Sequence, residues 1–409
     1  MKLQYNYETS LISQKDIEQY TDALSTEINR IRTQPYAFLT IPENTPYQEM
    51  CKKIIAEKQA LSPAALLVIG IGGSNMGARA VCEALYTTKK FTCPVYWADT
   101  LEETYIQTLI HILEKYLSAQ QTILITIISK SGTTTETIIN SAVFFELLKK
   151  YYPKDYHNYI IIITDRDSPL WRTGHELSCT TVEIPQTLGG RYSVFSAVGI
   201  IPLGILGIDT DALLKGASAY DHESAVLYAA LLYAQYKNKK YINDLFLFCP
   251  ALAALGAWYR QLMGESLGKD GKGIVPTVSI GTVDLHSVTQ LYLDGPDIFY
   301  TVFIAPIKHK NALSIIQNKF SHIITQRTVI MHDVYASIFK GTLAAYTQQK
   351  RPYITLYFPE LNEYWLGAYM QQCMVSMVYC AALMKVNPFN QPHVELYKEE
   401  TRKFLSHLY

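Results

Sequence analysis

Six hydroxyl side chains gather around one glycine in residues 129–137, which read S-K-S-G-T-T-T-E-T. A short apolar, β-branched run precedes them, and apolar residues at helical spacing follow over 138–151, so the cluster is predicted to lie at a strand-to-helix turn. Free backbone N–H groups and the positive end of the helix dipole favour an anion there. An ordinary helix cap needs only one hydroxyl, so a cluster of six favours a phosphate site.

A second loop, residues 70–77, reads G-I-G-G-S-N-M-G. Glycines let the backbone turn sharply and approach a ligand closely. The alternative is the dinucleotide fingerprint G-x-G-x-x-G, but Asn75 stands at its sixth position; Asp99, at a later strand end, keeps that alternative open. A sugar or phosphate cradle with Ser74 as a donor fits better. Both loops follow nearby strands, so we expect them to line one crevice at the carboxyl edge of a sheet.

Two charged residues in the middle of the chain are candidates for charge stabilisation and proton transfer. Arg191 follows Gly189 and Gly190, so it is free to reach an oxyanion, although a surface arginine after a turn is the plainer alternative. Glu265 lies near the end of an expected helix over Leu252–Leu267. A carboxylate there faces the negative end of the helix dipole, which suits a general base; a solvated terminal glutamate is the alternative.

Two further residues carry weaker signals. His286 follows an expected strand, two residues after Asp284, and an imidazole exchanges protons near neutral pH, but most single histidines are surface or core residues. Lys398 falls on the charged face of a terminal helix, where lysine is usually only solvated.

His175 and Cys179 stand at a ligand-like spacing, but no second pair completes a zinc site. No metal or other cofactor is therefore expected.

Composition restricts the class of protein. The 409 residues predict two domains. Lys plus Arg and Asp plus Glu balance at 36 each, so neither nucleic acid nor an anionic membrane is an expected partner. Seven scattered cysteines without a C-x-x-C pair favour free thiols in a reducing compartment. Residues 1–20 lack the apolar core of a signal peptide, and the longest apolar run, 194–208, contains Gly and Pro. We therefore expect a soluble, cytoplasmic protein.

Strand and helix patterns alternate along the chain, which predicts the α/β class with mainly parallel sheets flanked by helices. The expected strands are Ala64–Ile69, Val95–Ala98, Thr122–Ile128, Tyr159–Thr164, Thr181–Ile184, Leu245–Phe248, Val275–Ile280, Phe299–Ile304 and Tyr353–Phe358. We expect four segments: a mostly helical arm over 1–45, α/β domains over 46–185 and 186–387, and a turn with a helix over 388–409.

Together these segments resemble the glucose-6-phosphate isomerase family, also called phosphoglucose isomerase. Five motifs occur in the family's order: Gly70–Ser74, Ser129–Thr137, Gly189–Ser193 with Ala197-Val198-Gly199, Gly264–Lys269 with Gly281–Ser287, and Asn387–Lys398. The first two alone indicate a sugar-isomerase-type (SIS) phosphate-binding domain, which also occurs in sugar-phosphate sensors and lyases. The last three distinguish the isomerase from those relatives.

The resemblance implies two SIS domains and a reaction of glycolysis and gluconeogenesis, in which D-glucose 6-phosphate and D-fructose 6-phosphate interconvert through ring opening and a cis-enediolate. It implies that Glu265 moves the proton, that Arg191 stabilises the enediolate, and that His286 and Lys398 open the ring. It assigns contacts with the sugar phosphate to Gly73, Ser74, Ser129, Lys130, Ser131, Thr133, Thr134, Gly190 and Gln391. It also implies a C-terminal helix packed on the active site, and a homodimer in which His286 comes from the neighbouring subunit.

The chain departs from the family at three positions. Leu285 stands where Gln is usual, Asn390 where Asp is usual and His393 where Gly is usual, which affects contacts near His286 and the loop before Lys398. Two alternatives remain at this point: a non-catalytic sugar-phosphate sensor, and a dual phosphoglucose/phosphomannose isomerase. A pure binder does not need the set of four residues assigned to proton transfer and charge stabilisation, which favours the enzyme.

Overall fold

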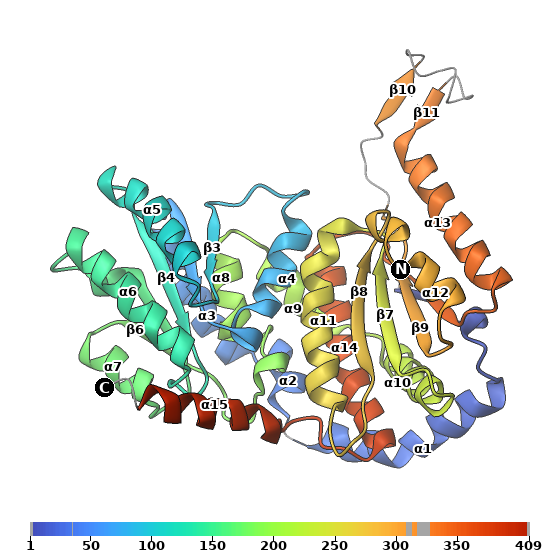
Figure 1. Cartoon of the computed structure of the whole chain (residues 1–409). Coiled ribbons are helices and arrows are strands. Elements are labelled where there is room, and N and C mark those ends of the chain that lie inside the picture. Colours follow the sequence, from blue (N-terminus) through green and yellow to red (C-terminus); the bar gives the residue numbers. More distant parts are fainter. Residues whose placement is uncertain (1–2, 35, 308–312, 317–327, 407–409) are drawn as a thin grey trace.

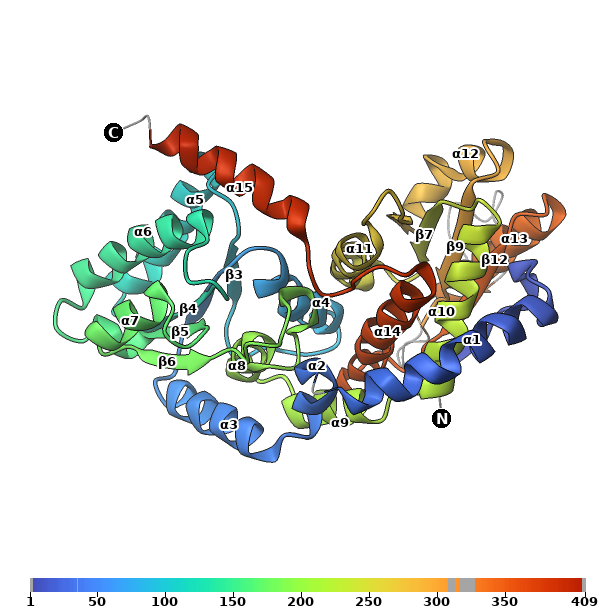
Figure 2. The same ribbon diagram turned by 90° about the horizontal axis from the view of Figure 1, so that it is seen from below.

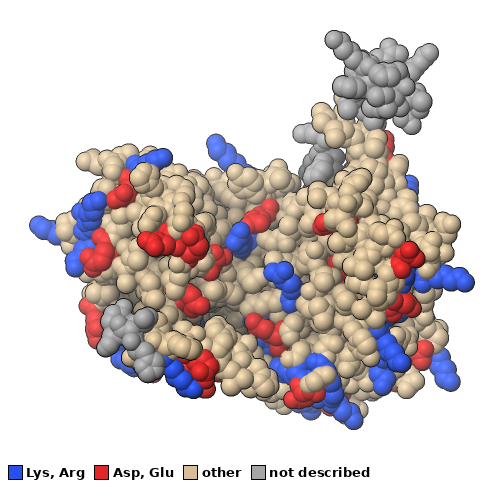
Figure 3. Space-filling view, in the orientation of Figure 1, with Lys and Arg blue, Asp and Glu red and all other residues tan. Residues whose placement is uncertain are grey.

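Two five-stranded sheets, each covered by helices on both faces, form the two halves of the chain (Figure 1). The structure is a computed structural model that describes residues 3–34, 36–307, 313–316 and 328–406. The predicted α/β class with mainly parallel, helix-flanked sheets is confirmed. Within the described ranges, every helix is too short or too polar to cross a bilayer. Acidic and basic side chains intermix over the face shown in Figure 3.

The first sheet is parallel throughout, with strand order β3-β2-β4-β5-β6. Its strands are β2 (Ala65–Ile69), β3 (Val95–Ala98), β4 (Ile123–Ile128), β5 (Ile160–Thr164) and β6 (Thr180–Glu183). β2 shows why the central strands are almost entirely apolar: Ala65, Leu67 and Ile69 pack on one face, and Leu66 and Val68 on the other. Strands of a sheet that is buried on both faces are typically near-continuous apolar runs.

In the part of the chain that the structure describes, six helices cover the two faces of the first sheet. α5 (Glu103–Ser118), α6 (Thr135–Tyr151) and α7 (Pro169–Glu176) share a core with one face. α3 (Thr45–Gln59), α4 (Met76–Leu85) and α8 (Ala197–Ile205) share a core with the other. α4 also packs against α11 (Ala253–Leu267) of the second half, so the two halves have a common core.

The second sheet has strand order β1-β12-β9-β7-β8. Its strands are β1 (Gln4–Asn6), β7 (Ile242–Leu247), β8 (Val275–Ile280), β9 (Phe299–Ile304) and β12 (Tyr353–Tyr357). The edge strand β1 is antiparallel to β12, and the other pairs are parallel. β1 lies within the segment that was expected to be a mostly helical arm. That segment therefore contains both the helix α1 (Gln14–Thr33) and one strand of the second sheet.

α1, α10 (His222–Lys237), α11 and α14 (Glu363–Met384) lie on one face of the second sheet, and α12 (Thr289–Asp294) and α13 (Met331–Gln348) lie on the other. The chain also contains the helices α2 (Ala37–Thr40) and α9 (Thr210–Ser218). The strands β10 (Ser314–Ile316) and β11 (Thr328–Ile330) pair before α13. The last helix, α15 (Pro392–Leu405), runs from the end of α14 across to the first half (Figure 2).

Candidate active site

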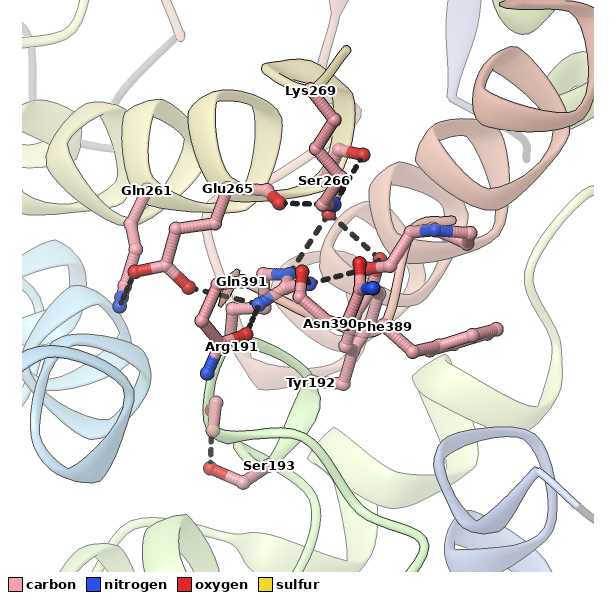
Figure 4. Close-up of polar contacts among 12 residues, drawn as sticks. Arg191, Tyr192, Ser193, Gln261, Glu265, Ser266, Lys269, Phe389, Asn390 and Gln391 are labelled. Carbon is pink, nitrogen blue, oxygen red and sulfur yellow. Dashed lines mark hydrogen bonds and ion pairs between the residues drawn. The ribbon is translucent and has the colours of Figure 1, made fainter. Parts of the chain in front are cut away.

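Arg191 is the centre of a polar cluster between the two halves (Figure 4). It lies in the short helix η5 (Gly190–Tyr192), and only 2% of its surface is exposed. Its guanidinium donates to Glu265 Oε2 at 2.9 Å, to Gln391 Oε1 at 2.7 Å and to Ser266 Oγ at 3.0 Å. It also donates to the carbonyl oxygen of Pro388. A buried charge is tolerated where such partners surround it, so these bonds fix the orientation of the guanidinium.

Glu265 lies on the last full turn of α11, with its carboxylate held from both sides. Arg191 binds one oxygen, and Gln261 Nε2 donates to the other at 2.9 Å. The Glu265 side chain is 30% exposed, whereas that of Arg191 is 1% exposed. The carboxylate is therefore the accessible member of the pair, and the guanidinium is fixed behind it. This geometry suits a base beside a positive charge.

The glycine-rich loop of the first half, residues 70–77, is in direct contact with the segment that carries Arg191. Gly73 lies in the short helix η3 (Gly72–Ser74), and its carbonyl accepts a hydrogen bond from Ser193 Oγ at 3.1 Å. A Cβ on Gly73 would lie 2.2 Å from the carbonyl carbon of Gly190 and 2.7 Å from the backbone nitrogen of Arg191. Only glycine fits this contact without a shift of the backbone.

Replacing Gly73 with alanine is therefore expected to lower both activity and stability. The methyl group would separate the two loops, and overpacking of this kind costs about 1–3 kcal/mol. Chemical denaturation and steady-state kinetics measure the two effects. The matched control is Gly341→Ala on α13, where a Cβ would meet no atom within 4 Å, so neutral or slightly higher stability is expected. Equal behaviour of the two variants would contradict the interpretation of the Gly73 contact.

The hydroxyl cluster lies where predicted, between β4 and α6. Thr134 occupies the N-cap of α6, but its hydroxyl bonds to Ser129 Oγ at 2.9 Å instead of to a helix N–H. Ser131 Oγ accepts hydrogen bonds from the backbone and the hydroxyl of Thr133. Gly132 has φ +65°, a conformation that glycine adopts readily. The helix start is thus left for an anion, which favours a phosphate site over an ordinary cap.

Both loops lie at the carboxyl edge of the first sheet, because β2 and β4 are parallel neighbours. A Cβ on Gly70 would lie 3.0 Å from the carbonyl oxygen of Ile128, so the loops start in contact. Ser74 is half-buried. Lys130 Nζ donates to the Gln186 carbonyl at 2.8 Å, which connects the hydroxyl loop to the segment before Arg191. The glycine-rich loop therefore lies between the hydroxyl loop and the Arg191–Glu265 pair.

The structure does not bring Lys398 to this pair. None of the described residues of α15 is buried, and Lys398 Nζ pairs with Glu395 Oε1 at 2.7 Å on the surface of that helix. Among the described residues of the expected C-terminal segment, those that bind Arg191 are at its start: Pro388, Asn390 and Gln391.

His286 lies at the opposite end of the second half. α11 ends at the amino edge of the second sheet, and β8 runs from there to the carboxyl edge (Figure 1). The six residues of β8 span about 20 Å, and His286 comes after them in the exposed helix η7 (Val283–His286). Within one chain, His286 is therefore remote from Glu265.

Sequence reasoning missed Gln261 and Ser266 as partners of the charged pair. Gln261 precedes Glu265 by four residues on one helix, a spacing that places both side chains on the same face, so this signal was available.

Asp99, the residue that kept the dinucleotide alternative open, instead accepts from Asn75 Nδ2 at 2.9 Å and pairs with Arg79 at 3.2 Å. In the described ranges, His, Cys, Asp and Glu side chains do not form a group of three suited to a metal ion.

Comparison with known proteins shows the family and the fold of this chain. The family model for phosphoglucose isomerase matches residues 50–409. A glucose-6-phosphate isomerase of Clostridium tetani is 34% identical over 358 residues, which cover 82% of this chain and 78% of that protein. A hypothetical protein of Thermus thermophilus has the same fold, with a TM-score of 0.89, 26% identity and coverage of 98% and 99%.

A solved glucose-6-phosphate isomerase of Chlamydia trachomatis shares the fold at a TM-score of 0.83 and 17% identity, over 99% of this chain and 89% of that one. The expected SIS-type architecture is thus confirmed. Since the family model covers nearly all of the chain and sequence identity exceeds 30% over most of a relative's length, this chain belongs to the phosphoglucose isomerase family.

Proposed function

We propose that this chain interconverts D-glucose 6-phosphate and D-fructose 6-phosphate. The observation that carries the proposal is the accessible Glu265 carboxylate bound to the buried Arg191 guanidinium, in a chain of this family. Glu265 takes the proton from C2 of the open-chain aldose and returns it to C1 of the resulting cis-enediolate, while the hydroxyl proton moves from O2 to O1, which gives the ketose. Arg191 stabilises the negative charge of the enediolate from a fixed position, so little reorganisation accompanies the reaction.

The hydroxyl loop holds the phosphate in this proposal. Ser129, Ser131 and Thr134 offer uncharged donors at the start of α6, where the helix dipole favours a doubly charged anion. Ser74 adds a donor from the adjacent loop, and Gln391 contacts the sugar phosphate from beside Arg191. Gripping the phosphate there positions the first two carbons of the sugar against Glu265.

We also propose a cytoplasmic homodimer in which the partner subunit supplies His286 for ring opening. Two observations support it: His286 is remote from Glu265 in its own chain, and apolar side chains are exposed around it. Tyr335 of α13 donates to the Gly281 carbonyl at 2.6 Å, which places the start of α13 beside the His286 loop. The exposed apolar residues of this loop, of α12 and of the first part of α13 are Val283, Leu291, Met331, Val334 and Ile338. Exposed apolar residues that lie together often mark an interface, and a second subunit would bury these.

We propose that Lys398 takes part in ring opening, the role that the family resemblance implies. Replacing Lys398 with alanine is therefore expected to slow the conversion of a cyclic sugar phosphate more than that of an acyclic one. Values of kcat/KM with the two kinds of substrate measure the difference. The matched control is Lys403→Ala, which removes the same type of surface pair on α15, Lys403 with Glu400 at 2.7 Å. Equal losses with both substrates would contradict a ring-opening role.

A coupled assay tests the proposed function. Purified protein is supplied with fructose 6-phosphate, and the glucose 6-phosphate formed is oxidised by a dehydrogenase that is added in excess. Sustained turnover is expected. Binding of the sugar phosphate without turnover would contradict the proposal and indicate a sensor. A parallel reaction with mannose 6-phosphate shows whether the chain also tolerates the C2 epimer.

A further inference from the structure

Lys269 caps the helix that carries Glu265. The last carbonyls of an α-helix have no partner within the helix, and α11 ends at Leu267, two residues after Glu265. Lys269 Nζ donates to the main-chain oxygen of Glu265 at 2.6 Å and to that of Ser266 at 3.0 Å. Lys269 is only 8% exposed. Its ammonium thus holds the backbone of the proposed base itself.

Lys269 is also connected to the guanidinium of Arg191 through Ser266. Ser266, whose main chain Lys269 binds, accepts the hydrogen bond from Arg191 Nε at 3.0 Å through its side chain. Figure 4 shows this arrangement, with Lys269 on the far side of Ser266 from Arg191. Tyr192 also bonds to Ser266, at 2.8 Å. The hydrogen bonds therefore run from Lys269 through the end of α11 to both members of the charged pair.

Burial disfavours the charged form of Lys269, and its position at the carboxyl end of a helix favours that form. Burial lowers the pKa of Lys269 to about 8; Arg191 acts in the same direction, while Glu265 and Asp270 oppose it. A cation is favourable at the carboxyl end of a helix, and charge-assisted hydrogen bonds are roughly twice as strong as neutral ones. The end of α11 is therefore held more firmly below pH 8 than above it.

We propose that Lys269 is a positioning residue for the proton transfer: by binding the main-chain oxygens of Glu265 and Ser266, it fixes the carboxylate relative to the guanidinium of Arg191. The inference rests on the proposed function, because it assigns a role in that reaction. Lys269 itself does not touch the sugar. Its effect is on the rate of the chemical step, since a displacement of about 1 Å in such a site costs on the order of 100-fold.

The test compares Lys269→Met with wild type. The variant keeps the length and apolar stem of lysine and removes the ammonium. A fall in kcat of about tenfold to 100-fold, with a much smaller change in KM, is expected. The matched control is Lys58→Met: Lys58 is 6% exposed on α3, donates to the Asn158 carbonyl at 2.7 Å and has a pKa lowered by burial. It lies away from Glu265, so its variant should keep the wild-type kcat.

A pH profile separates positioning from mere stabilisation. The kcat of wild type is expected to fall above pH 8, whereas Lys269→Arg, which stays charged, should move that fall to higher pH. A kcat for Lys269→Met within twofold of wild type, an equal loss in Lys58→Met, or an unchanged profile in Lys269→Arg would each overturn the inference. If Lys269→Met does not fold, the arginine profile decides. An inactive wild type would overturn the proposed function and this inference together; an active one tests the inference alone.

Discussion

Replacing Glu265 with glutamine is expected to lower the rate of isomerisation by about 10²–10⁴-fold, the usual contribution of a positioned general base. The amide has the same shape as the carboxylate and its oxygen still accepts from Arg191, but it cannot take the proton from C2. Binding of the sugar phosphate should change only a few-fold. Incorporation of deuterium from heavy water into the substrate, followed by NMR, measures the lost step directly.

The matched control for this variant is Glu83→Gln. Glu83 forms the same type of ion pair, with Arg79 at 2.6 Å on α4, but lies outside the polar cluster of Arg191. It should keep the wild-type exchange rate. Deuterium exchange at the wild-type rate in a folded Glu265→Gln protein would show that another residue is the base.

Replacing Arg191 with lysine is expected to lower kcat by about 10²–10³-fold. The guanidinium binds Glu265, Gln391 and Ser266 at once, and a lysine ammonium has neither the fork geometry nor the number of donors to replace it. The acceptors left without a partner should also lower the free energy of unfolding by about 1–3 kcal/mol. Kinetics with glucose 6-phosphate and denaturant unfolding measure the two effects.

Arg166→Lys is the control for the arginine variant. Arg166 pairs with Glu183 at 3.0 Å on the surface, where 61% of its side chain is exposed, and such pairs contribute about 0–1 kcal/mol. Activity and stability should stay near wild type. Full activity in Arg191→Lys would mean that a charge at this position, without its fixed bonds, is enough for the reaction.

Much of the fold was predictable because buried parallel strands are continuous apolar runs. β3, β8 and β9 have the predicted bounds, and most other strands differ by one or two residues. β1 was not predicted. A strand of three residues carries too little alternation to be recognised, and its place beside β12 depends on the tertiary structure.

The candidate site was predictable to the extent that motifs lie on neighbouring elements. The sequence placed the hydroxyl loop and the glycine-rich loop at one sheet edge, and the structure agrees because β2 and β4 are adjacent. The contacts of Arg191 with Glu265 and Gln391 join residues 74 and 200 positions apart, which no local pattern specifies. The separation of His286 from Glu265 follows from the direction of β8, and the surface pair of Lys398 with Glu395 follows from the exposed course of α15. Both are features of the assembled chain.

A crystal structure of the protein with fructose 6-phosphate would show directly where the substrate binds. The phosphate is expected to lie against Ser129, Ser131 and Thr134 at the start of α6, with the Glu265 carboxylate within about 3.2 Å of the carbons that exchange the proton. A phosphate bound elsewhere, or a sugar whose C1 and C2 lie away from Glu265, would contradict the proposed reaction.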